Sequence, residues 1–183
     1  MSIVTRPLTY DDLAQMPADG NRYEVIDGEL VVTPAPVKAH QKLLYRITRL
    51  IGDYVEERQL GEVYFAPVDV RFFMTDIVQP DLLFIRRDRL GIYESGSIVE
   101  GAPDLVIEVL SPSTRMVDLV PKAALYARGG VSEYWVADPD EHSLVVYVLR
   151  EGRYEPVPAE AGKVRSFALP GLVVDLGALF ASL

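Results

Sequence analysis

The chain has 183 residues, a formal net charge of −9 and no cysteine, and 49% of its residues are hydrophobic. These values are typical of one globular domain, exclude disulfides and thiolate metal sites, and leave no apolar run of the roughly 18 residues that a membrane span needs. The negative charge disfavours indiscriminate nucleic-acid binding, and the absence of a signal-peptide pattern after Met1 leads us to expect a cytoplasmic protein.

Helix and turn signals are clear in the first third of the chain. Asp12 follows Thr9 by three residues, as in a capping box. Asp27-Gly28 tolerates the positive φ angles of a two-residue hairpin turn, and Gly61 follows a long apolar stripe at helical spacing. These signals predict, in chain order, a short helix ending near Met16, hairpin strands at 22–26 and 29–33, and a helix at about 37–59.

The rest of the chain alternates between strand patterns and one further long helix. Ser111-Pro112-Ser113-Thr114 predicts a turn and helix cap, Gly129-Gly130 ends that helix, and Glu151-Gly152 predicts another hairpin turn. The remaining predicted elements are strands at about 62–73, 81–86 and 104–110, a loop at 87–102, a strand at 132–138, hairpin strands at 143–149 and 153–157, and a strand at 172–174 followed by a short helix from Asp175.

The order of these elements predicts an α/β (α+β) fold with a mixed sheet flanked by helices. The helix between strands 104–110 and 132–138 is long enough for a right-handed parallel crossover, whereas the closely connected earlier strands favour antiparallel pairing. The core order is helix, strand, strand, strand, helix, strand. We expect a single domain over 1–183, with an N-terminal helix and hairpin at 1–36, the core at 37–139, and a C-terminal hairpin and short helix at 140–183.

Two acidic residues interrupt strand-like apolar runs and are the strongest functional signal. Asp81 lies in one run, and Glu108 lies in another, on the same face as Val106 and Leu110 if the strand is regular. Burying such a charge without a partner costs several kcal/mol, roughly, so a partner is expected. Carboxylate oxygens suit Mg²⁺, which promotes phosphodiester hydrolysis, and a nearby lysine would orient or deprotonate the attacking water.

An ordered series of motifs extends this signal over more than a hundred residues. The motifs are Tyr23-Glu24-Val25-Ile26-Asp27-Gly28-Glu29-Leu30, His40, Pro80-Asp81, the run from Pro103 to Thr114, Asp118, Lys122, Tyr126, and Glu133-Tyr134-Trp135-Val136-Ala137-Asp138-Pro139. The series resembles the Uma-type family of putative restriction endonucleases, within the PD-(D/E)XK (restriction-endonuclease-like) nuclease superfamily. The resemblance covers almost the whole chain and implies the nuclease core order predicted above.

The resemblance also implies roles for individual residues. Asp81 and Glu108 match the two acidic motif residues and would bind the metal together with the backbone carbonyl of Val109. Leu110 stands where the superfamily pattern has its lysine, and Lys122, on the following helix, is the matching position in the family.

Three more residues fall at positions where they would support this site. Glu24 and His40 would act as a supporting ligand or a phosphate contact, and Asp118 would pair with Lys122 one helical turn away. The resemblance therefore implies a nuclease that uses Mg²⁺ or Mn²⁺ to hydrolyse phosphodiester bonds in DNA. Because cutting two strands commonly requires two active sites, a homodimer is expected.

Simpler interpretations remain open for each residue alone. Asp81 suits a turn at a strand entry, Glu108 suits a structural pair with Lys122 or an arginine, Lys122 suits a helix surface, and His40 suits a cap or packing position. Tyr134 and Trp135 are expected in the core rather than as base-stacking platforms.

Two alternative functions follow from these interpretations. The first is a non-catalytic binding or regulatory module that keeps the nuclease fold and acts with a partner protein or nucleic acid, favoured by the acidic charge and by Leu110. The second is a structural homodimer formed through the apolar segments 172–174 and 179–180.

Overall fold

The computed structural model describes residues 6–94, 96–113 and 115–183, and its largest element is a six-stranded mixed sheet. The strand order is β11-β10-β9-β8-β6-β3. Its members are β3 (Gly61–Phe65), β6 (Leu82–Arg86), β8 (Leu105–Val109), β9 (Glu133–Asp138), β10 (Ser143–Arg150) and β11 (Arg153–Val157). β8 and β9 are parallel, while the other neighbouring pairs are antiparallel. The predicted parallel crossover and mixed sheet are confirmed.

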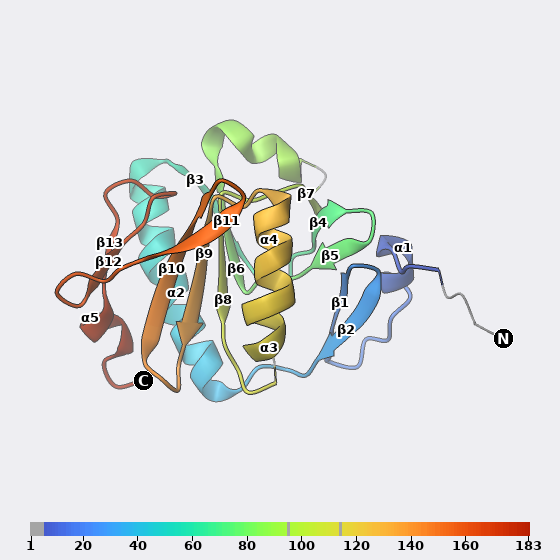
Figure 1. Cartoon of the computed structure of the whole chain (residues 1–183), viewed down its shortest axis with the longest axis horizontal. Helices are drawn as coiled ribbons and strands as arrows, with labels where there is room; N and C mark the ends of the chain where they lie inside the picture. The colour runs from blue at the N-terminus through green and yellow to red at the C-terminus, as the bar shows by residue number, and fades with distance from the viewer. Residues whose placement is uncertain (1–5, 95, 114) are drawn as a thin grey trace.

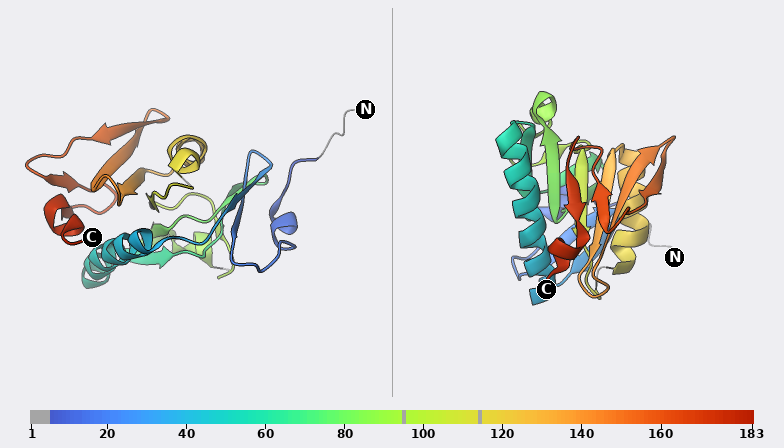
Figure 2. Two further views of the ribbon diagram at one scale, coloured as in Figure 1. Left: turned by 90° about the horizontal axis from the view of Figure 1, so that it is seen from below. Right: turned by 90° about the vertical axis from the view of Figure 1, so that its left-hand side faces the viewer.

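Alternating side chains on the central strands divide the core into two layers. Leu105 and Ile107 of β8 belong to the cluster that contains the long helix α2 (Lys38–Arg58), whereas Val106 packs with α4 (Ala123–Gly129) on the other face. Figure 2 shows the sheet between α2 on one side and the α3–α4 segment on the other. The central strands are therefore buried on both faces.

A second, five-stranded sheet lies beside this core, with the order β2-β1-β5-β4-β7 (Figure 1). Its strands are β1 (Arg22–Ile26), β2 (Glu29–Thr33), β4 (Val70–Phe73), β5 (Asp76–Val78) and β7 (Val99–Glu100). The predicted hairpin of β1 and β2 is confirmed, with Asp27 and Gly28 both at positive φ. The capping box of Thr9 and Asp12 also forms, but α1 is shorter than predicted and ends at Leu13 (Tyr10–Leu13).

Several predicted elements need correction. The single strand predicted at about 62–73 is two strands, β3 and β4, which belong to different sheets and are separated at Ala66-Pro67. The predicted loop at 87–102 contains the 3-10 helix η1 (Arg87–Tyr93) and β7. β5 and β12 (Lys163–Arg165) were not predicted, because runs of three residues are too short to show a periodic pattern.

The helix predicted after the 111–114 turn is interrupted. It consists of α3 (Arg115–Val117), the π-helical segment η2 (Asp118–Lys122) and α4, while Thr114 lies outside the described residues. Pro121 lies inside η2. Proline has no N–H to donate to the preceding turn, and single π turns inside helices are a common adjustment, often at functional sites.

Most apolar side chains of the two C-terminal segments belong to the core. β13 (Val173–Asp175) pairs with β12, and α5 (Leu176–Phe180) is capped by Asp175, where the short helix was predicted to begin. Leu172, Val174, Leu179 and Phe180 are buried in the α2 layer. Val173 is the exposed apolar residue of these two segments, so the structural-homodimer alternative keeps a much smaller apolar surface than the sequence indicated.

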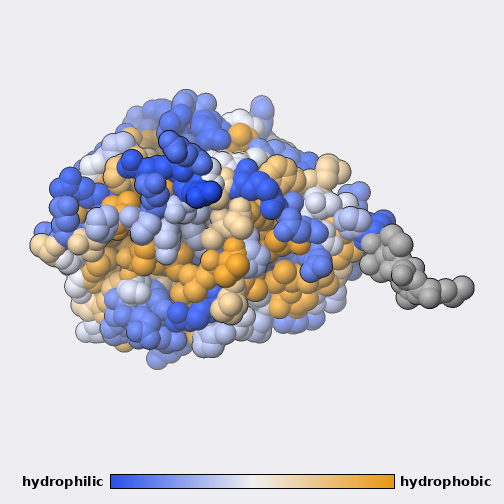
Figure 3. All heavy atoms as spheres, viewed as in Figure 1, coloured by the Kyte–Doolittle hydropathy of each residue, from blue (hydrophilic) through white to orange (hydrophobic). Residues whose placement is uncertain are grey.

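A group of exposed apolar side chains lies on α3 and η2, at Met116, Leu119 and Val120. In Figure 3 hydrophobic surface gathers across the middle of the face that carries these elements. Among the described residues, no helix combines the length and the apolar character required to cross a membrane.

Candidate active site

Sheet pairing brings the two predicted metal ligands to the same place. β6 and β8 are antiparallel neighbours with Leu82 opposite Ile107, so Asp81 and Glu108 are the next pair along the register. The backbone N–H of Val109 donates a 2.9 Å hydrogen bond to Asp81 Oδ2, which fixes this carboxylate against β8. Both acidic side chains are buried, with exposures of 2% and 1%. The mid-strand position of Glu108 therefore does place its carboxylate inside the protein.

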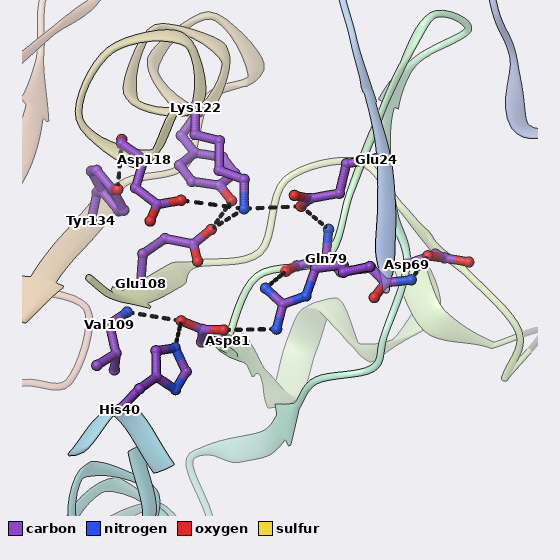
Figure 4. Close-up of polar contacts among 12 residues, drawn as sticks. Glu24, His40, Asp69, Gln79, Asp81, Glu108, Val109, Asp118, Lys122 and Tyr134 are labelled. Atoms are coloured by element: carbon purple, nitrogen blue, oxygen red, sulfur yellow. Dashed lines mark hydrogen bonds and ion pairs between the residues drawn. The ribbon is translucent and has the colours of Figure 1, made fainter. Parts of the chain in front are cut away.

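Lys122 reaches Glu108 from η2, the segment that precedes α4. Its Nζ lies 2.9 Å from Glu24 Oε1, 3.0 Å from Glu108 Oε1 and 3.5 Å from Asp118 Oδ1 (Figure 4). The side chain is buried, so the surface-lysine interpretation is wrong. Leu110, at the usual lysine position, is instead buried in the α4 layer. The ammonium group beside Glu108 therefore comes from η2 and not from the residue after β8.

Asp118 and Tyr126 complete the surroundings of Lys122 and Glu108. Tyr126 O–H donates a 2.5 Å hydrogen bond to Glu108 Oε1, and Tyr134 O–H donates a 3.0 Å bond to the Asp118 carbonyl. Asp118, Lys122 and Tyr126 recur every fourth residue, which explains why one side of this interrupted helix faces the site. Tyr134 is buried, as is Trp135, and the prediction that they belong to the core is confirmed.

Glu24 brings the five-stranded sheet into the site. Besides its ion pair with Lys122, its Oε1 accepts a 2.7 Å hydrogen bond from the backbone N–H of Gln79. The other oxygen, Oε2, is buried and has no hydrogen-bond partner among the described residues. A buried carboxylate oxygen without a donor is unfavourable, so this oxygen is available to a ligand.

Asp81 is held by two further side chains, one of which the sequence patterns did not identify. His40 Nε2 lies 2.9 Å from Asp81 Oδ2, and Arg22 donates a 3.0 Å hydrogen bond to Asp81 Oδ1. Arg22 also donates to the Gln79 carbonyl at 3.0 Å. Strand alternation could have revealed Arg22, because it lies two residues before Glu24 and so shares its face of β1.

The charges of this cluster do not cancel. Among the described residues, it contains the four buried carboxylates of Glu24, Asp81, Glu108 and Asp118 and the two cationic side chains of Arg22 and Lys122. Four negative and two positive charges leave −2 when all are ionised. At neutral pH a proton on Glu108 offsets one of these charges when no metal is bound, because the pKa of Glu108 is raised to about 8.

Proton affinities reflect the same imbalance. Burial and the negative charges of Asp118, Asp81 and Glu24 raise the pKa of Glu108. The positive charge of Lys122 lowers it by less, so the pKa is about 8. Burial also acts to raise the pKa of Asp81, but the hydrogen bond from His40 and the charge of Arg22 lower it to about 2.

The pKa of Lys122 changes in the direction that keeps it charged. Burial opposes the charged form, but the negative charges of Glu108, Glu24 and Asp118 outweigh it and raise the pKa. Lys122 is therefore an ammonium group at neutral pH, suited to orient a ligand and stabilise negative charge rather than to accept a proton.

A small cavity lies between these groups. It has a volume of about 20 Å³, and its lining includes Asp81, Glu108, Asp118, Arg22 and His40. We call it the inner cavity. A site of this size admits one water molecule or one small ion.

The comparison with family models decides the relationship that the motifs suggested. The model of the Uma2 family, described as “Putative restriction endonuclease”, matches residues 10–177. The chain belongs to this family. A search of curated proteins finds no match.

The fold of a Uma2 chain is also found in a crystal structure. A protein of Anabaena variabilis, described as a putative nuclease belonging to DUF820, superposes with a TM-score of 0.78 and 22% sequence identity. The match covers 95% of this chain and 98% of that one, so the two share the whole fold. The predicted restriction-endonuclease-like fold is thereby confirmed, and family and fold together support a nuclease.

Whether the Uma2 site fits a divalent metal can be tested on its donors. Within the described ranges, no three His, Asp or Glu side chains are grouped as a metal centre. Mg²⁺ does not need such a group, because it commonly keeps several waters and binds one or two carboxylates. The carboxylate oxygens of Asp81 and Glu108, which both line the inner cavity, are the donor type that fits such an ion.

Proposed function

We propose that this protein is a Mg²⁺- or Mn²⁺-dependent endonuclease that hydrolyses phosphodiester bonds in DNA. The observation that carries the proposal is the buried cluster of four carboxylates and two cationic side chains beside the inner cavity. Such an ion, when bound, supplies positive charge to the phosphate and lowers the pKa of the attacking water. Membership of a family described as restriction endonucleases supports the same activity.

Each residue of the cluster has a role that follows from its contacts. Asp81 and Glu108, with the Val109 carbonyl, would hold the metal, and the Val109 N–H keeps Asp81 aimed at β8. Lys122 would orient the attacking water and stabilise the charge that develops on the phosphate, because its ammonium lies 3.0 Å from Glu108. Glu24 and Asp118 position Lys122.

A second candidate function rests on the pairing of Asp81. His40, Arg22 and the Val109 N–H already bind its two oxygens. If these contacts persist when metal is added, the chain is a non-catalytic module that uses the nuclease fold to bind a partner protein or nucleic acid. The two functions differ in whether Asp81 gives up its contact with Arg22 or His40 in order to bind a cation.

Metal binding and cleavage tests separate these functions. Purified protein should nick plasmid and cut single-stranded DNA with Mg²⁺ or Mn²⁺ and should lose this activity on Asp81→Asn and Glu108→Gln. Isothermal calorimetry should detect Mn²⁺ binding to the wild type and not to Asp81→Asn. Both substitutions keep side-chain size and replace a carboxyl group that can bind a metal with an amide.

The matched control is Glu57→Gln, because Glu57 is an exposed carboxylate whose side chain is 70% accessible. It should cleave like the wild type. Equal cleavage by Asp81→Asn would identify a contaminating nuclease and reject the catalytic function, and the absence of Asp81-dependent metal binding would favour the binding module.

A further inference from the structure

A larger cavity adjoins the inner cavity and opens to the surface. We call it the outer cavity; it has a volume of about 380 Å³, and its lining includes Arg22, His40, Phe65 and the prolines 34, 36 and 67. Arg22, His40, Pro34 and Pro36 line both cavities, so the two lie on either side of the same four residues. An occupant of the outer cavity would therefore lie next to the Arg22 and His40 side chains that contact Asp81.

Phe65 is an exposed aromatic side chain held in a fixed position relative to Asp81. It pairs with Leu82 in the β3–β6 register, and the N–H of the next residue, Ala66, donates a 3.0 Å hydrogen bond to the Asp81 carbonyl. Despite this rigid backbone, 61% of the residue is exposed. A single exposed aromatic needs no explanation by itself, but this one borders the cavity that leads to the carboxylates.

Polar groups at the inner end of the outer cavity are suited to a phosphate or a base. His40 is buried, and its Nδ1 has no hydrogen-bond partner among the described residues, although Nε2 contacts Asp81. The Arg22 guanidinium is partly exposed, with 19% of its side chain accessible. Side-chain amides of Asn21 and Gln41 also line the cavity and can donate or accept hydrogen bonds.

The size of the outer cavity limits its occupant. A volume of about 380 Å³ is near the lower end of small-ligand sites, which suits one nucleotide but not a stacked base pair with both backbones. Resting on the proposed function, we propose that the outer cavity holds one unpaired DNA nucleotide, its base stacked on Phe65 and its phosphate against Arg22. The substrate is thus DNA that is single-stranded at the cleavage point.

This assignment agrees with the charge of the protein. Binding to duplex DNA depends on many cations along the backbone, whereas stacking on aromatic side chains supplies affinity for single strands without a large basic surface. The chain carries a net charge of −9, and one cation, Arg22, faces both cavities.

Binding experiments without metal test the inference separately from cleavage. Fluorescence anisotropy in EDTA would use a labelled single-stranded DNA of about 12 nucleotides, within the site sizes of single-strand binding folds, and the same sequence as a duplex. Phe65→Ala should weaken single-strand binding about 5- to 150-fold, the range reported by alanine substitution for one stacked base. Phe167→Ala, which removes another exposed phenylalanine, is the control and should bind like the wild type.

A second variant gives a direct signal of stacking. Phe65→Trp should keep the affinity, and single-stranded DNA should quench its added fluorescence, because the only native tryptophan, Trp135, is buried. Equal binding of single strand and duplex, unchanged binding by Phe65→Ala, or unquenched Phe65→Trp would overturn the inference. Single-strand binding that depends on Phe65, without any metal-dependent cleavage, would support nucleotide binding in the outer cavity and reject the proposed nuclease activity instead.

Discussion

The raised pKa of Glu108 leads to a specific dependence of stability on pH in the absence of metal. Folding raises this pKa from its ordinary value of 4.5 to about 8, so between these values the folded protein holds a proton that the unfolded chain has released. The stabilising proton is fully bound below the lower value and is lost as the pH rises through the upper one. The free energy of unfolding should therefore fall from pH 5 to pH 8.

The size of the effect follows from one proton. A single titrating group changes the free energy of unfolding by at most about 1.4 kcal/mol per pH unit. The pKa of Asp81 is lowered to about 2, so its own contribution changes below the window and with the opposite sign. Glu108→Gln keeps a neutral side chain of similar shape, so this part of the pH dependence should disappear in the variant.

Urea denaturation at half-unit pH steps, in EDTA, measures the effect. The wild type should lose stability toward pH 8 more steeply than Glu108→Gln, and the control Glu57→Gln should follow the wild type. Parallel curves for the wild type and Glu108→Gln would show that folding does not raise the pKa of Glu108, which would contradict the argument that burial and the neighbouring carboxylates hold its proton.

Two further predictions concern buried charged side chains. Lys122→Met should destabilise the fold at pH 7 by about 3–5 kcal/mol, because it leaves buried carboxylates unpaired, and by less at pH 5. Urea denaturation would measure both losses, with the exposed Lys163→Met as the control. Equal losses at both pH values would contradict the charge argument. Glu133→Gln should lower the free energy of unfolding by about 1–3 kcal/mol, because Glu133 Oε2 accepts hydrogen bonds from the backbone N–H groups of Phe167 and Ala168, which an amide nitrogen cannot do. The exposed Glu155→Gln is the control. If Glu133→Gln is as stable as the wild type, these bonds contribute nothing.

The sequence predicted those parts of the fold that local chemistry determines. Turn residues such as Asp27-Gly28 fix the hairpins, and the apolar stripe over 37–59 fixes α2, so their boundaries are confirmed within a residue or two. The break between β3 and β4 was missed because the residues on both sides favour strands, and only tertiary pairing assigns them to different sheets.

The site shows the same division between local and tertiary information. Asp81 and Glu108 are conspicuous because each interrupts an apolar run, and the structure brings both to one cavity. That Lys122 contacts Glu24 as well as Glu108 depends on how η2 packs between two sheets, which no local pattern encodes. Arg22 was missed because a single arginine at the start of a strand resembles any exposed edge residue.

Placing the lysine on a helix rather than on β8 has a structural consequence. A lysine at position 110 would belong to the same strand as Glu108, whereas Lys122 contacts Glu108 on the six-stranded sheet and Glu24 on the five-stranded sheet at once. The ammonium group therefore joins the two sheets through the site itself. A cation at Asp81 and Glu108 would compete with Lys122 for Glu108 and leave it more closely paired with Glu24 and Asp118. Metal binding should then alter the contact between the sheets, and with it the position of Arg22 on β1, which borders both cavities.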